Sequence, residues 1–414
     1  MSDKKRKVPK LRFPGFTDAW EQRKLGEMSE KMEYGLNAPA MEYDGTNKYL
    51  RITDIDEETR EFTKTNLTSP RINLSESAQY LLVRKDILFA RTGASVGKTY
   101  CYREEDGDVY FAGFLIRARI KETFDEEFIF QYTLTKMYSE YINVTSQRSG
   151  QPGVNANEYS NLPILTPDLS EQEKIGLMLR KFDSLISLHQ RKLDNVKMLK
   201  KSLLQKLFPK DGEKIPELRF PGFTDDWEQR KLGSMATFSK GCGYSKSDLI
   251  DSGHEVILYG RLYTSYDTVI SSVNTYVELN DKSVISVGGE VIVPASGESP
   301  EDIARASVVE KEGVALGGDL NIIRPKSSLD SVFLALSISN GSQKKELSKR
   351  AQGKSVVHLH NSDLKEVIIL YPKVEEQSKI SDLFISFDSL ITLHQRKLDH
   401  LKELKKGLLQ QMFV

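Results

Sequence analysis

The stretch of this sequence most suggestive of chemistry is the run GASVGKT at residues 93–99. A phosphate-cradling loop needs four residues between its two glycines, and this run has three. Because removing one residue displaces the backbone amides that must converge on a phosphate, the run argues against nucleotide binding. Its polar side chains instead suit contacts with nucleic-acid phosphates or base edges, unless the loop is a solvated hairpin. The candidate DNA-binding residues here are Arg91, Thr92, Ser95 and Lys98.

Further candidates combine arginine and an amide side chain with glycine, at matching positions in the two halves of the chain. Residues 148–155 read RSGQPGVN, and residues 350–356 read RAQGKSV. Arginine pairs bidentately with guanine, and glutamine or asparagine with adenine, so these loops suit reading of the major groove. The candidates in these loops are Arg148, Gln151 and Asn155 in the first half, and Arg350, Gln352 and Lys354 in the second. Residues 296–300, SGESP, correspond in position to the run at 93–99 and add Ser296, with Arg305 after them. His358 and His360 follow, and we expect them to be core or water-bonded histidines.

The motifs of several enzyme classes are absent from the sequence. We find no glycine-rich loop for S-adenosylmethionine after a strand, no amino-methylation motif of the Asn-Pro-Pro-aromatic kind, and neither a nuclease signature nor a helicase motif set. Cys101 and Cys242 lie far apart without metal-ligand spacing, which argues against a zinc site or a disulfide framework. We therefore expect no catalytic residues, no bound metal and no cofactor in this chain.

The elements that must position the candidate loops are repeated. Residues 11–26 and 218–233 differ at a single position, and residues 182–194 return almost unchanged at 387–399, with offsets of 207 and 205 residues. The segments between these markers, residues 28–168 and 235–374, share no long string. A duplicated frame that holds two different inserts is typical of a pseudo-symmetric recognition subunit, because the frame does one job twice while each insert reads something different.

Two long helices follow the inserts. Steps of three and four between apolar residues predict one seam per helix, and the matching stripes predict an antiparallel coiled coil with the inserts at opposite ends. Ser170 and Glu173 form a capping box at the first helix start. His189 and His394 take equivalent places, either to fix the register or at the stripe edge, bonded to water. The first seam is Ile175, Met178, Phe182, Leu185, His189, Leu193, Val196, Leu199, Leu203 and Leu207; the second is Ile380, Leu383, Phe387, Leu390, His394, Leu398, Leu401, Leu404 and Leu408.

The inserts have the mixed texture of short strands and helices, with helices expected at residues 125–143 and 331–348. The fold class is therefore α+β: two pseudo-symmetric mixed α/β recognition domains separated by two long helices. The expected segments are a frame at 1–27, a recognition domain at 28–169, a helical spacer at 170–210, the repeated frame at 211–234, a second recognition domain at 235–374 and a second spacer at 375–414.

Size and composition set broad limits. The 414 residues are enough for two to four domains, and a formal net charge of zero does not decide for or against DNA binding. We expect Cys101 and Cys242 to be reduced thiols of a cytoplasmic protein. No apolar run approaches the length that spans a bilayer, so we expect no membrane binding.

The repeated frame, the divergent inserts and the helices beginning EQEKI and EEQSKI resemble the specificity subunit of type I restriction–modification systems. The resemblance implies that each recognition domain reads one half of a bipartite site in double-stranded DNA. It also implies that two methyltransferase subunits and motor–nuclease restriction subunits bind the frame, and that S-adenosylmethionine, ATP and magnesium belong to these partners. Candidates for methyltransferase contact, unless they are a solvated helix face, are Gln190, Arg191, Lys192, Gln395, Arg396 and Lys397. The alternatives are a coiled-coil adaptor that binds only proteins and a cryptic enzyme.

Overall fold

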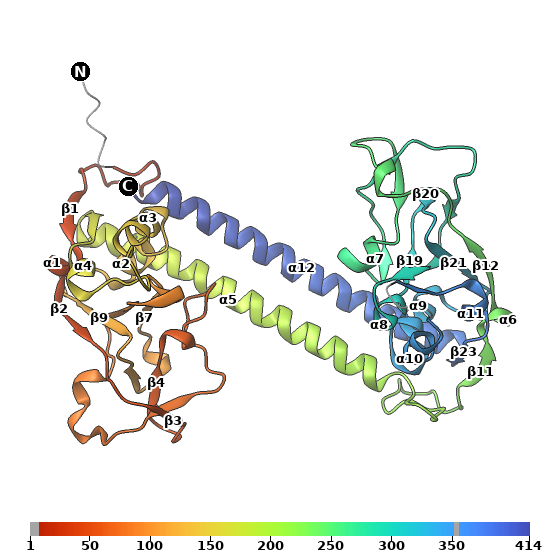
Figure 1. Cartoon of the computed structure of the whole chain (residues 1–414), viewed down its shortest axis with the longest axis horizontal. Coiled ribbons are helices and arrows are strands. Elements are labelled where there is room, and N and C mark those ends of the chain that lie inside the picture. The colour runs from red at the N-terminus through yellow and green to blue at the C-terminus, as the bar shows by residue number, and fades with distance from the viewer. Residues whose placement is uncertain (1–7, 352–355) are drawn as a thin grey trace. The chain divides into compact units, whose positions relative to one another are not determined.

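The computed structural model describes residues 8–351 and 356–414, which divide into two compact units (Figure 1). The first unit contains the chain up to Gln190 together with Arg396–Val414, and the second contains Arg191–Gln395. Helices α5 (Leu169–Lys206) and α12 (Val374–Met412) each begin in one unit and end in the other. Each unit is therefore built from one insert, one frame segment, and half of each long helix.

The first insert is folded around an antiparallel sheet of four strands in the order β2-β9-β6-β7. Every residue of β6 is buried, which makes this strand the centre of the core. The remaining strands form three pairs, β1-β10, β3-β5 and the parallel β4-β8. The strands are β1 (Glu21–Lys24), β2 (Ser29–Tyr34), β3 (Ala40–Glu42), β4 (Lys48–Leu50), β5 (Thr68–Pro70), β6 (Asp86–Ala90), β7 (Thr99–Cys101), β8 (Val109–Phe111), β9 (Leu115–Ile120) and β10 (Pro163–Thr166). The short helices are α1 (Leu25–Met28), α2 (Glu126–Tyr132), α3 (Lys136–Thr145) and α4 (Ala156–Ser160).

The second insert repeats this plan and enlarges it. Its five-stranded sheet has the order β12-β21-β17-β19-β14, and a four-stranded sheet, β15-β13-β20-β16, is added. Two further pairs are β11-β23 and β18-β22. The strands are β11 (Glu228–Lys231), β12 (Ala236–Lys240), β13 (His254–Ile257), β14 (Val269–Ile270), β15 (Tyr276–Val277), β16 (Ile285–Val287), β17 (Glu290–Pro294), β18 (Ser296–Gly297), β19 (Ser307–Val309), β20 (Glu312–Leu316), β21 (Leu320–Pro325), β22 (Val357–His358) and β23 (Ile368–Tyr371). The helices are α6 (Leu232–Met235), α7 (Arg261–Thr264), α8 (Pro300–Ile303), α9 (Ser331–Ser339), α10 (Gly341–Arg350) and α11 (Asn361–Lys365).

The α+β class and the shared architecture of the inserts are confirmed, with one correction to each expected helix. The helix expected at 125–143 is two helices, because α2 ends at Tyr132 with Thr133 as its C-cap, and Thr135 begins α3 by accepting the Tyr138 N–H. The helix expected at 331–348 is broken at Asn340, which has an extended backbone between α9 and α10. The segment boundaries proposed from the sequence stay a prediction.

The repeated frame residues make the same contacts in both units. Arg12 donates two hydrogen bonds of 2.7 Å to the buried Glu171 at the start of α5, and Arg219 binds Glu376 at the start of α12 in the same way at 2.8 Å. The buried Trp20 packs edge-on against Phe128 and Phe413 in the first unit. In the second unit, Trp227 packs edge-on against Phe333 and Phe208 in the same way. The two nearly identical frame segments thus bind the two long helices through the same contacts.

The helices run antiparallel within each unit, since the start of α5 shares a core with the end of α12 in the first unit, and the start of α12 shares a core with the end of α5 in the second. Ion pairs at repeat-equivalent positions join them. Lys405 pairs with Asp183 in the first unit, and Lys200 pairs with Asp388 in the second. Asp168, not Ser170, caps α5, since its Oδ1 accepts the Glu171 N–H at 2.9 Å. The expected capping box is therefore wrong. The carboxylate of Glu171, the residue after Ser170, accepts the hydrogen bonds from Arg12 of the frame segment.

The expected seam is also wrong in part. Ile175 and Leu193 are buried as expected, but the buried stripe of α5 continues through Leu179 and Ile186, whereas Leu185 and Leu199 are exposed. In α12, Ile380, Phe387 and Leu398 are buried as expected, while Leu390 and Leu404 are exposed. His189 and His394 are both half-buried, and their expected role in fixing the register stays a prediction.

Candidate nucleic-acid interface

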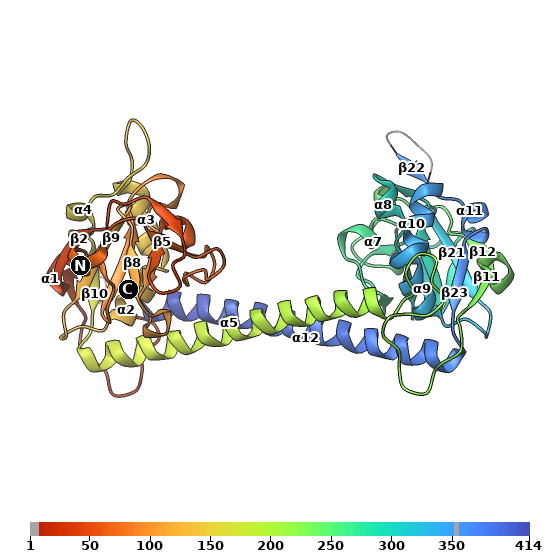
Figure 2. The same ribbon diagram turned by 90° about the horizontal axis from the view of Figure 1, so that it is seen from below.

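The two candidate loops of the first insert lie against each other. Thr92 forms an antiparallel bridge with Gly153, and the Gly93 N–H donates to the Pro152 carbonyl at 3.0 Å. We call residues 91–96 and 147–155 together the first reading surface. Its second segment, between α3 and α4, projects on the side of the unit away from α5 (Figure 2). Loops that are more than fifty residues apart in sequence thus form one surface.

Gly93 and Gly97, the two glycines that resemble those of a phosphate-binding loop, are required by the backbone conformation and by close neighbours. Gly93 has a φ of +73°, and a Cβ there would lie 3.0 Å from Gln151 Nε2. Gly97 has a φ of +82°, and a Cβ there would lie 2.7 Å from Ile142 Cγ2. The left-handed backbone and the close neighbours each exclude a side chain, so the two glycines fit the loop against the Gln151 segment and α3.

The second insert brings the corresponding loops together in the same way. Strand β18 pairs with β22, so that Ser296 lies opposite His358, and the Ser296 Oγ is 3.3 Å from His358 Nδ1. We call residues 296–299 and 356–360 the second reading surface. The rings of His358 and His360 lie parallel with centroids 6.4 Å apart, and both residues are exposed. Neither is a core histidine; the alternation with the buried Val357 and Leu359, a period of two, was the signal that both point outward.

The candidate side chains of the first insert divide into surface and supporting groups. Thr92 and Ser95 are half-buried, and Gln151 is exposed on the first reading surface. Arg148 donates to the Thr145 and Gln147 carbonyls and pairs with Glu158 at 2.5 Å, so its guanidinium is engaged in ordering the loop. Asn155 caps α4, with its Oδ1 accepting the Glu158 N–H at 2.9 Å. Asn155 and Glu158 form a capping box, since the Glu158 carboxylate in turn accepts the Asn155 N–H at 2.8 Å.

Lys98 lies beneath the loop rather than on it. Its side chain is 6% exposed, and its ammonium pairs with Glu57 and donates to the Ile55 carbonyl at 3.2 Å. This position suits a support for the loop, and a contact from Lys98 to DNA would require the ion pair to open.

The candidates of the second insert are mostly engaged within the protein. The Arg305 guanidinium lies over the rings of Tyr263 and Tyr266 and donates to the Leu262 carbonyl at 3.0 Å. Arg350 pairs with Glu346 on the same face of α10 at 2.8 Å. Ser296 is half-buried on the second reading surface. Gln352 and Lys354 lie outside the described residues.

Two residues beside the first reading surface were not predicted from the sequence. Tyr34, at the end of β2, and Phe114, in the turn between β8 and β9, are 43% and 56% exposed. Each ring lies against the guanidinium of Arg91. No local pattern could have found them, because the three residues are distant in sequence and meet only in the folded sheet.

The largest perturbations of side-chain acidity lie in the core and not on the reading surfaces. Burial raises the pKa of Asp125 to about 6, although its carboxylate caps α2 by accepting the Phe128 N–H. Burial also raises the pKa of the Cys101 thiol, which keeps that thiol protonated and unreactive. Within residues 8–351 and 356–414, no cluster of three or more His, Cys, Asp or Glu side chains is arranged to hold a metal ion. Over the same residues, no helix combines the length and apolar character needed to cross a membrane.

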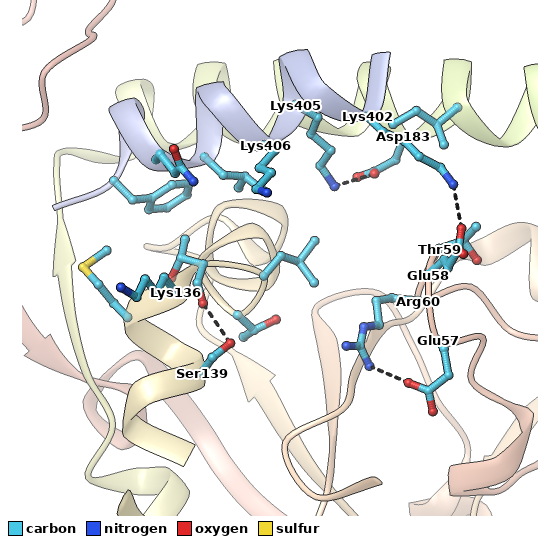
Figure 3. A pocket seen from close by; sticks show the side chains of 18 of the residues that line it. Glu57, Glu58, Thr59, Arg60, Lys136, Ser139, Asp183, Lys402, Lys405 and Lys406 are labelled. Carbon is cyan, nitrogen blue, oxygen red and sulfur yellow. Dashed lines mark hydrogen bonds and ion pairs between the residues drawn. The ribbon is translucent and has the colours of Figure 1, made fainter. Parts of the chain in front are cut away.

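The first unit also contains a cavity of about 1030 Å³ between its insert and its helices (Figure 3). Lys402 on α12 pairs with Glu58 at 2.6 Å, and Ser187 on α5 donates to Glu61 at 3.2 Å. The segment carrying these acids also holds Glu57, the partner of Lys98. Residues 55–61 therefore connect the support of the first reading surface to both long helices.

The long helices expose a second apolar stripe. On a helix with 100° between residues, the buried Ile175, Leu179, Ile186 and Leu193 fall within an arc of roughly 40°, and the exposed Leu177, Leu185, Leu188 and Leu199 within another arc of roughly 80°. Three of these exposed leucines recur in α12 as Leu390, Leu393 and Leu404. Of the candidate partner-binding residues, Arg191, Lys192, Arg396 and Lys397 are exposed, and Gln190 and Gln395 are half-buried.

Comparisons with known proteins agree on one family. The family model described as "Type I restriction modification DNA specificity domain" matches residues 17–198 and 224–403. The chain is 21% identical over 418 residues to the type I restriction enzyme MjaVIII specificity subunit of Methanocaldococcus jannaschii, covering 98% of this chain and 93% of that protein. It is 23% identical to the putative MjaX specificity subunit of the same organism, covering 95% and 93%. The crystal structure of a type I restriction-modification S subunit from M. genitalium has the same fold, with a TM-score of 0.67, 13% identity, and 98% and 99% coverage.

Proposed function

Because this chain belongs to the type I restriction–modification DNA specificity family, we propose that each insert reads one half of a bipartite site in double-stranded DNA. One observation carries the proposal. In both units, the loop after the central strand of the sheet pairs with the segment before the last short helix, through Thr92 and Gly153 or through Ser296 and His358. Inserts that differ in sequence thus build one kind of surface, as expected for two readers with different targets.

The proposal assigns the long helices to partner subunits. An exposed apolar stripe that recurs at repeat-equivalent positions suits two copies of one partner, each meeting the same residues. We propose that two methyltransferase subunits dock on Leu185 and Leu188, and on Leu390 and Leu393, with Arg191, Lys192, Arg396 and Lys397 beside them. Restriction subunits join this assembly for cleavage. S-adenosylmethionine, ATP and magnesium are bound by these partners in the cytoplasm, and this chain itself is not catalytic.

The test compares cells that express the chain together with its methyltransferase subunit to cells that express that subunit alone. Methylation-aware sequencing of their DNA should reveal a bipartite methyladenine motif only when the chain is present. If expression and assembly of both proteins are verified and no motif appears, the chain is a helical adaptor without DNA selectivity. The exposed leucine stripe would suit that second function equally well.

A further inference from the structure

The guanidinium of Arg91 lies over two exposed aromatic rings. Its Cζ lies 5.1 Å from the ring centroid of Tyr34 and 5.9 Å from that of Phe114. A guanidinium stacks on aromatic faces through its own plane, which leaves its N–H groups pointing outward at the edge. The rings thus restrict the orientation of the guanidinium without using its hydrogen-bond donors.

The backbone of Arg91 is fixed as well. Its N–H donates to the Phe114 carbonyl at 3.1 Å, and its own carbonyl accepts the Val154 N–H at 2.9 Å. Tyr34 is tied to the same place, because its hydroxyl accepts the Ala156 N–H at 3.2 Å. Three elements therefore meet at Arg91: the end of β2, the turn before β9 and the start of α4. An arginine with a fixed backbone and a stacked side chain loses little conformational entropy when it binds.

The donors of Arg91 set it apart from the other candidate arginines. Arg148 pairs with Glu158, Arg305 donates to the Leu262 carbonyl, and Arg350 pairs with Glu346. Among the residues that the structure describes, the Arg91 guanidinium has no carboxylate or carbonyl partner, and the Arg91 backbone lies against Gly153 and Val154 of the first reading surface. Parallel N–H donors of this kind match the O6 and N7 acceptors of guanine in the major groove.

We infer that Arg91 is the guanine reader of the first half-site, and that Tyr34 and Phe114 are the residues that position it. The inference rests on the proposed function and adds to it the base, the residue and the geometry. It predicts at least one guanine in the half-site assigned to the first insert. It also predicts that charge alone is insufficient, because a lysine ammonium cannot donate bidentately or stack as a plane.

The test uses the chain assembled with its methyltransferase subunit, and duplexes carrying the methylation motif. Replacing the relevant guanine by 7-deazaguanine removes only the N7 acceptor, and we expect it to weaken binding of the wild-type complex by roughly tenfold or more. Arg91→Lys should weaken binding to the natural duplex by roughly 10- to 100-fold, and 7-deazaguanine should then have little further effect. Phe114→Ala should reduce discrimination at the same base several-fold, whereas Phe114→Tyr, which keeps the ring, should leave it intact.

Arg84→Lys is the matched control, since Arg84 lies in the same unit, 72% exposed, and pairs with Glu126 away from the first reading surface. It should leave both half-sites unchanged. A first half-site without guanine would overturn the inference while leaving the proposed function standing. So would a 7-deazaguanine penalty that is the same in the wild type and in Arg91→Lys. Methylation without any motif that depends on this chain would overturn the proposed function, and the inference with it.

Discussion

Replacing Phe413 by alanine should destabilise the first unit and leave the second intact. The ring of Phe413 is 6% exposed, and its centroid lies 5.0 Å from that of Phe128, 6.1 Å from that of Tyr132 and 6.4 Å from that of Trp20. Truncating a buried phenylalanine to alanine costs about 3–5 kcal/mol, from lost burial and from the cavity that remains. Because the frame residues and α2 close around this ring, we expect the free energy of unfolding of the first unit to fall by about 3 kcal/mol.

Amide hydrogen exchange of the full chain separates the two units. A loss of about 3 kcal/mol corresponds to roughly a hundredfold faster exchange through global opening of the unit. The affected amides should be those of α2, β6 and β9, while α9 and β17 keep their protection. Phe208→Ala is the matched control, since Phe208 stacks on Phe333 at 5.5 Å in the second unit and should produce the reverse pattern. Equal loss in both units, or a loss below 1 kcal/mol, would refute the reasoning.

Three further predictions concern acidity, the loop and the helices. Burial raises the folded-state pKa of Asp125 to about 6, above the ordinary aspartate value of about 3.9. The folded state therefore binds this proton more tightly than the unfolded state, and protonation of Asp125 should stabilise the first unit by about 1–3 kcal/mol as the pH falls from 6.5 to 4. Asp125→Asn, which keeps the helix cap, should flatten that dependence in urea unfolding, and an unchanged slope would count against the assignment. Gly93→Ala should weaken selectivity for the first half-site only, since it forces an L residue into a φ of +73° beside Gln151, at a cost of about 1–2 kcal/mol; methylation sequencing reads this out, and loss at the second half-site would contradict it. The double variant Leu188→Asp, Leu393→Asp should change the free energy of unfolding by less than about 0.5 kcal/mol and should abolish co-purification with the methyltransferase subunit. An intact complex would refute the proposed docking surface.

The internal repeat made the architecture predictable. The periodicity of apolar residues was not sufficient to predict which face of each long helix is buried. A helix with two apolar stripes satisfies steps of three and four on either stripe, so the sequence cannot tell which stripe is buried. In α5, Leu179 and Ile186 are covered by the unit, and Leu185 and Leu188 are not. The same limit explains the wrong helix cap. Asp168 and Ser170 are both competent caps; in the structure Asp168 accepts the Glu171 N–H, and the Glu171 side chain is bound by Arg12, 159 positions away.

The sequence predicted which loops form the two reading surfaces, but only partly which of their side chains are exposed. The candidate loops were chosen for their matching positions in the two inserts. That the two loops of each insert pair with one another is visible only in the structure. Whether a given cation faces outward depends on partners that local sequence does not reveal, as with Lys98 and Glu57, 41 residues away. The aromatic rings around Arg91 come from β2 and from the turn before β9, so only the strand order β2-β9-β6 brings them together. The exception is Asn155, whose capping role was readable from Glu158 three positions on.

The most direct test of the central claim, that each insert reads one half of the site, is an exchange of inserts. Residues 28–168 are replaced by the corresponding insert of another specificity subunit whose motif is known, with the frame and both long helices left unchanged. Methylation-aware sequencing should then show one half of the motif replaced by the donor's half, with the other half retained. A change in both halves, or in neither while the complex still methylates, would contradict the account.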